Sequence, residues 1–177
     1  ERDQDNSGWL GQMAGSMAPH RFVRTIAEMT LGVDARCVRC HDDATGLQRT
    51  QRDYWAFHAL LTRQGHSFFE LPDGRQAMAE PGVPAAWMGR DADGSRGKLS
   101  AGEWADRLIG SNVFAAATID QLWRAVHGRP LVKSPLDPGP DAASLRRLRD
   151  ELAGDLIASD FDLARALALV VTSPAAR

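Results

Sequence analysis

The sequence lacks the features that would tie it to a membrane, to a nucleic acid or to a zinc site. No apolar run reaches the roughly 18 residues that a membrane-spanning helix needs. The net charge of −2 gives no basic field, so a nucleic acid is not an expected partner. Its 177 residues contain only two cysteines, and no second pair exists to complete a zinc site. What remains is an ordinary globular composition, 44% hydrophobic and 25% charged, sufficient for one domain or two small lobes.

The two cysteines lie three positions apart, and a histidine follows the second one directly, in the order Cys37-Val38-Arg39-Cys40-His41. Cys-x-x-Cys-His is the attachment signature of a c-type haem. Two thiols form thioether bonds at one edge of the porphyrin, and the next residue gives an imidazole nitrogen to the iron. The sequence therefore predicts one covalent haem c, attached through Cys37 and Cys40, with His41 as the proximal iron ligand.

Other interpretations of the cysteine pair are a redox Cys-x-x-Cys, half of a zinc site and a short-loop disulfide. A zinc site needs four cysteine or histidine ligands. A thioredoxin-type motif lies next to a βαβ pattern, and the sequence shows no alternation of strands and helices. Haem attachment is therefore favoured.

Helical periodicity dominates the chain, and the sequence predicts an all-α fold with no strand. We expect a helical c-type cytochrome domain with a helical C-terminal extension. Residues 1–17 are expected to form an extended arm, residues 18–99 the haem-binding region, and residues 100–177 a C-terminal helical region packed on it. Apolar spacing together with proline, capping and glycine signals predicts helices that begin near Pro19, Gln51, Ser100, Asn112, Ser144 and Phe161.

Three further expectations concern packing. Residues 66–99 are the least regular part and are predicted to be a loop that covers the open face of the haem. The helix from Phe161 to Thr172 is apolar on nearly all sides, so we expect it to be buried. Trp123 shares a helix face with Ile119 and Leu122 and is predicted to pack in the core.

Two stretches carry a resemblance to known proteins, one around the cysteines and one in the C-terminal third. Their residues are Leu31-Gly32-Val33, His41-Asp42, Asp53-Tyr54-Trp55, Asn112, Phe114, Ala115, Trp123, Gly128-Arg129, Leu131-Val132, Asp162-Leu163 and Ser173. In this order they resemble the planctomycete-type cytochrome c family, large exported bacterial proteins with paired domains of unknown function. The resemblance implies a haem-bearing exported protein and passes on no defined activity.

An electron carrier needs a second axial iron ligand opposite His41. Small c-type cytochromes resemble one another in taking a methionine from an irregular loop several tens of residues further on. Met88, which follows Trp87 in such a segment, fits best, and its alternative role is a thioether that fills a gap in the core. The other candidates are His66, Met78, His58, Met29, Met13, Met17, His20 and His127.

These observations favour a monohaem c-type cytochrome, an electron-transfer protein or a subunit of a larger exported redox complex, over an enzyme. The alternative is a haem enzyme or gas-binding domain with an open sixth position, served by His66 or His58 with Arg63. The expected partners are redox proteins or a larger membrane-associated or extracellular complex. Because such haems are attached outside the cytoplasm, we expect a periplasmic or otherwise extracytoplasmic protein. The start at Glu1 is expected to reflect a removed signal.

Overall fold

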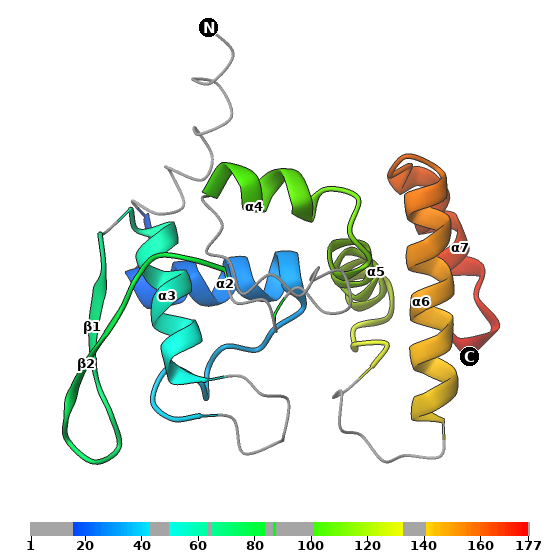
Figure 1. Ribbon diagram of the computed structural model, residues 1–177. Coiled ribbons are helices and arrows are strands. Elements are labelled where there is room, and N and C mark those ends of the chain that lie inside the picture. The colour runs from blue at the N-terminus through cyan, green and yellow to red at the C-terminus, as the bar shows by residue number, and fades with distance from the viewer. Residues whose placement is uncertain are drawn as a thin grey trace, which may run out of the picture.

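The computed structural model describes residues 16–42, 50–63, 65–83, 87, 101–132 and 141–176. Helices dominate these residues, and one short hairpin accompanies them (Figure 1). Helix α5 lies between α2 on one side and the α6–α7 pair on the other. The elements are α2 (Pro19–Leu31), α3 (Gln51–Leu61), β1 (Ser67–Glu70), β2 (Gln76–Ala79), α4 (Ala101–Leu108), α5 (Asn112–His127), α6 (Ala142–Ala158), α7 (Leu163–Thr172) and a final 3₁₀ turn, η3 (Pro174–Ala176).

Two helices that pack on each other organise the N-terminal part. Pro19 begins α2, where a missing N–H costs no helical hydrogen bond. Gly32 ends α2 with a φ of 62°, and its N–H bonds to the carbonyl oxygen of Ala27. Thr50 and Asp53 form a capping box at the start of α3, each side chain accepting the other residue's backbone N–H. Both helices contribute to one apolar cluster, here called the N-terminal cluster, which also contains Val33, Ala35, Val38, Trp87 and Trp104.

The prediction of an all-α fold is wrong, because part of the 66–99 region forms a β-hairpin. Strands β1 and β2 pair antiparallel, with Ser67 opposite Ala79. Between them the N–H of Gly74 bonds to the carbonyl oxygen of Leu71 at 2.9 Å. Gly74 has a φ of 81°, as in three-residue hairpin loops that close with a left-handed glycine.

The hairpin escaped the sequence analysis because each strand has only four residues, too few for a period-two pattern to stand out. Its stability comes from α3, since isolated two-stranded hairpins are marginal in water. The ring of Phe69 stacks on Trp55 with centroids 6.0 Å apart, and the Ser67 hydroxyl lies 3.1 Å from the His58 imidazole. Phe68 on the opposite face is 61% exposed.

Helices α5, α6 and α7 enclose a second apolar cluster, the C-terminal cluster. Trp123 is 1% exposed and lies in it with Ile119, Leu156 and Val170. This confirms the prediction that Trp123 packs in the core. Its indole ring also contacts the imidazole of His127, with ring centroids 4.4 Å apart.

The expectation that the last helix is buried is wrong. Of the residues of α7, only Ala166 and Val170 are buried, and the exposed ones include Leu163, Leu167 and Val171. The reason is that α7 packs on α5 and α6 from one side only. Among the described residues no helix is both long enough and apolar enough to cross a membrane.

Candidate functional site

The cysteine motif forms a tight turn after α2, at the surface of the N-terminal cluster. The backbone N–H groups of Cys40 and His41 both bond to the carbonyl oxygen of Cys37, at 3.2 and 3.4 Å. Val38, between the cysteines, is 2% exposed and anchors the turn in the cluster. Cys37 and Cys40 are both exposed and carry free thiols. The turn therefore presents two accessible thiols while its middle is fixed to the core.

The imidazole of His41 is exposed, and one of its ring nitrogens has a defined partner. Nδ1 lies 2.8 Å from the carbonyl oxygen of Asp42. A carbonyl oxygen only accepts hydrogen bonds, so Nδ1 is the donor, and Nε2 is the nitrogen that has the lone pair in the neutral imidazole. Backbone orientation of this kind is typical of histidines that ligate a metal.

Gln51, the first residue of α3, holds the turn in place. Its backbone N–H donates to Asp42 Oδ1 at 2.8 Å. Its side-chain amide donates to the carbonyl oxygens of Arg39 at 3.2 Å and Glu70 at 2.9 Å. The residue is 4% exposed, and so it joins the motif, the start of α3 and the end of β1. Sequence analysis missed this role, because a glutamine in a first helical turn has no distinguishing pattern.

Two aromatic rings and two imidazole rings form a cluster near the turn. The Tyr54 hydroxyl is 3.1 Å from His20 Nδ1, and the His20 ring centroid is 5.2 Å from that of His58 and 5.4 Å from that of Trp55. Burial lowers the pKa of His20, and the charge of Arg39 lowers it further. Burial also lowers the pKa of His58, with His20 adding to the effect, and raises the pKa of Tyr54 to about 12. At pH 7 both imidazoles are therefore neutral and the phenol keeps its proton.

The candidates for the sixth ligand occupy different places, and the first choice, Met88, lies outside the described residues together with Met13. His66 is exposed, with its ring against Phe68. Met29 and Met78 are 38% and 46% exposed. Three other candidates contact different residues. His58 lies at hydrogen-bond distance from Ser67, the ring of His127 contacts Trp123, and Met17 packs against the N-terminal cluster.

His20 bonds to Tyr54 and is close enough to Arg39 of the motif for that charge to lower the pKa of its imidazole. The three residues predicted to serve an open sixth position, His58, His66 and Arg63, differ in burial. His58 is buried and bonded to Ser67, whereas Arg63 and His66 are exposed.

Within the described ranges, no three His, Cys, Asp or Glu side chains converge in a way that could hold a metal ion. No protein-family model, no curated protein and no solved structure matches the chain. The resemblance to the planctomycete-type cytochrome c family therefore stays a prediction.

Proposed function

We propose that the chain is a monohaem c-type cytochrome, an electron-transfer protein or a subunit of an exported redox complex. The observation that carries the proposal is the motif turn itself. It combines two exposed free thiols with an imidazole whose Nδ1 is held by the Asp42 carbonyl oxygen, which leaves Nε2 for iron. This donor set fits haem c. The bound haem would supply a one-electron redox couple.

The protein residues have distinct tasks in this proposal. Cys37 and Cys40 form the thioether bonds, and His41 provides the proximal ligand. Val38 and Gln51 hold the turn against the N-terminal cluster and against α3, and so would keep the two cysteines and His41 in place around a bound haem. Such rigidity is what a site supported by surrounding packing and hydrogen bonds provides.

Met88 is proposed as the sixth ligand. The support comes from its neighbour, Trp87, which is 2% exposed and packs on Phe57 with ring centroids 5.4 Å apart. Trp87 and Val38 belong to the same apolar cluster. Trp87, which directly precedes Met88 in the sequence, is thus part of the core that also anchors the haem motif. A methionine–histidine pair would raise the reduction potential and keep external ligands off the iron.

The proposal is tested by producing the exported chain in cells that attach haem to Cys-x-x-Cys-His motifs. The expected result is the polypeptide mass plus one haem and a pyridine haemochrome spectrum typical of thioether-linked haem. Cys37→Ser with Cys40→Ser should abolish attachment, whereas the control His66→Ala on the hairpin should not. Recovery of the wild-type chain with two free thiols and no haem would refute the proposal.

Carbon monoxide separates the electron carrier from the alternative with an open sixth position. The reduced wild-type protein should not bind it, and Met88→Ala should. Met78→Ala, at an exposed methionine of the hairpin, is the matched control and should behave as the wild type. If Met88→Ala keeps a six-coordinate low-spin spectrum, Met88 is not the ligand, and His66 and His20 are the next to test.

The same proposal places the protein in the periplasm or elsewhere outside the cytoplasm, with redox proteins or a larger membrane-associated or extracellular complex as partners. Co-purification of the exported chain with other cytochrome subunits tests this part. A chain that stays alone under mild extraction and exchanges electrons with soluble donors would be a free carrier.

A further inference from the structure

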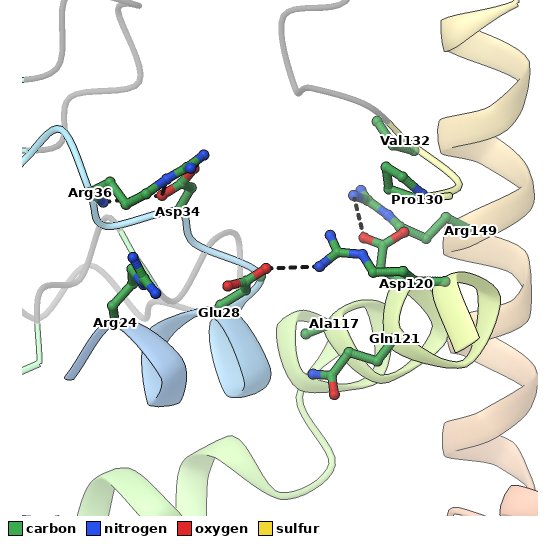
Figure 2. A pocket seen from close by; sticks show the side chains of 12 residues that line it. Arg24, Glu28, Asp34, Arg36, Ala117, Asp120, Gln121, Pro130, Val132 and Arg149 are labelled. Carbon is green, nitrogen blue, oxygen red and sulfur yellow. Dashed lines mark hydrogen bonds and ion pairs between the residues drawn. The ribbon is translucent and has the colours of Figure 1, made fainter. Parts of the chain in front are cut away.

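A polar cavity of about 500 Å³ lies where the two halves of the described chain meet, between α2 and α5 (Figure 2). The loop that leads into the cysteine motif and the residues after α5 complete its wall. The walls are held together by direct contacts. The Gln121 amide donates to the Met29 carbonyl oxygen at 2.8 Å. Gly32, after α2, lies close to Ala117 of α5. The volume is typical of a site for a small metabolite.

The lining is strongly charged, with four arginines, Arg24, Arg36, Arg124 and Arg149, against three carboxylates. Glu28 and Arg124 form an ion pair at 2.9 Å that joins α2 to α5. Both oxygens of Asp34 accept from Arg36 Nε at 2.9 Å. The lining arginines exceed the lining carboxylates by one, and Asp150 just outside the lining pairs with Arg149. The favourable place for an anion is therefore the arginine that has no such partner.

This arginine lies at the α2 side of the cavity. Arg24 projects from α2 (Figure 2) and makes no ion pair with a described residue. It acts on Asp34 only at longer range, because Arg36 already occupies both oxygens of that carboxylate. On this side Arg36 pairs with Asp34 and Glu28 pairs with Arg124. Arg24 therefore remains as the guanidinium that can bind a carboxylate or phosphate through two hydrogen bonds.

On the α5 side of the cavity, the Asp120 carboxylate lacks hydrogen-bond donors. Asp120 Oδ1 is buried and has no hydrogen-bond partner, although Oδ2 lies 3.7 Å from Arg149 Nη1. Arg149 is shared with Asp150, to which its Nε and Nη2 atoms donate at 3.2 and 3.1 Å. Oδ1 has almost no accessible surface, so a ligand cannot reach it. Oδ2 has only the distant Arg149 as a partner, and it is the oxygen to which a ligand in the cavity can donate.

We propose that this cavity binds a small hydroxylated oxyanion, with its carboxylate or phosphate on Arg24 and a hydroxyl group donating to Asp120 Oδ2. A neutral hydroxyl suits Asp120 better than an ammonium group does, because Arg124 and Arg149 already place positive charge around this carboxylate. The cavity is lined mostly by polar atoms, which agrees with a sugar-like ligand rather than an apolar one. The proposal does not rest on haem attachment.

Calorimetric titration of the full chain tests the proposal with two hydroxylated oxyanions, gluconate and glycerol 3-phosphate. Acetate supplies the charge without the hydroxyl groups, and glycerol supplies hydroxyl groups without the charge. At least one hydroxylated oxyanion should bind about tenfold more tightly than either control, and the preferred one distinguishes a carboxylate from a phosphate ligand. Binding of neither, or equal binding of acetate or glycerol, would overturn the proposal.

Two variants locate the binding. Arg24→Gln should weaken binding by at least about tenfold, the effect of losing a charge-assisted hydrogen bond. Arg21→Gln changes an exposed arginine of the same helix outside the cavity and should leave binding unchanged. Asp120→Leu keeps the side-chain shape, removes the acceptor and should weaken binding by a similar factor. Equal losses in the two arginine variants would refute the assignment, since only general charge would then matter.

Haem-loaded protein and the haem-free variant with Cys37→Ser and Cys40→Ser should bind the same probe with equal affinity. Arg36 lines the cavity and immediately precedes Cys37, so a propionate of the haem is the competing occupant. Binding to the haem-free chain alone would mean that the propionate fills the cavity, and would refute a free ligand. If the chain takes up no haem at all, the haem proposal fails while the binding test still stands.

Discussion

Replacing Asp120 by asparagine should make the protein more stable at neutral pH. The carboxyl group is partly buried, with 24% of its side chain exposed. Burial raises its pKa from 3.8 to about 6, and it outweighs the attraction of Arg149 and Arg124, which acts in the opposite direction. The ionised form is therefore less favourable in the folded chain than in the unfolded chain, even though an ion pair with Arg149 is present.

The size of the effect follows from the two pKa values. An acid whose pKa is raised on folding contributes its full stability below the unfolded pKa, and loses it as pH rises through the folded pKa. The free energy of unfolding therefore falls between about pH 4 and pH 6. Above that range the loss amounts to at most about 3 kcal/mol. Asp120→Asn removes the charge, so it should be more stable than the wild type by up to about 3 kcal/mol at pH 7.5 and nearly equal to it at pH 4.

Urea denaturation at both pH values measures this difference. Asp150→Asn is the matched control, because Asp150 also contacts Arg149 but its side chain is 66% exposed. The control should change the free energy of unfolding by less than about 0.5 kcal/mol. If Asp120→Asn were less stable than the wild type at pH 7.5, the attraction of the arginines would exceed the cost of burial, and the reasoning would be wrong.

Further predictions concern the motif, the core and the hairpin. Gln51→Ala should lower the free energy of unfolding by about 2–4 kcal/mol, because two carbonyl oxygens lose their donor; an unchanged urea midpoint would show that the glutamine does not hold the turn. Trp123→Ala should cost roughly 3–5 kcal/mol through cavity formation, and an unchanged melting temperature would contradict its placement in the core. Gly74→Ala should cost about 1 kcal/mol, because Gly74 has a φ of 81° with open space around it; Gly102→Ala, inside α4 with equally open space, should instead stabilise the protein by up to about 1 kcal/mol. A thermal shift of the same sign in both glycine variants would argue against the left-handed turn.

Local signals in the sequence determined most of the helices. Each helix begins within about two residues of the predicted position, because proline, capping residues and left-handed glycines act on their immediate neighbours. Thr50 at the start of α3 and Gly32 at the end of α2 are examples, because both make contacts with residues of their own helix. The cysteine motif is equally local, since its five consecutive residues suffice to predict the attachment chemistry.

The hairpin and the exposure of α7 depended on distant parts of the chain. The four-residue strands are stabilised by Trp55 and His58 of α3, which no pattern within residues 67–79 reveals. Helix α7 is apolar enough to be buried on all sides, but α5 and α6 cover only one side of it. How many neighbours surround a helix is a property of the assembled fold.

The cavity was decided by tertiary structure alone. Arg24 and Asp34 lie far from Asp120 in the sequence, and no common motif contains the three. They come together because Gln121 of α5 donates to the Met29 carbonyl oxygen of α2 and because Glu28 pairs with Arg124 across the same contact. Sequence determines chemistry that is contained in neighbouring residues, whereas a site assembled from two helices exists only once those helices have packed.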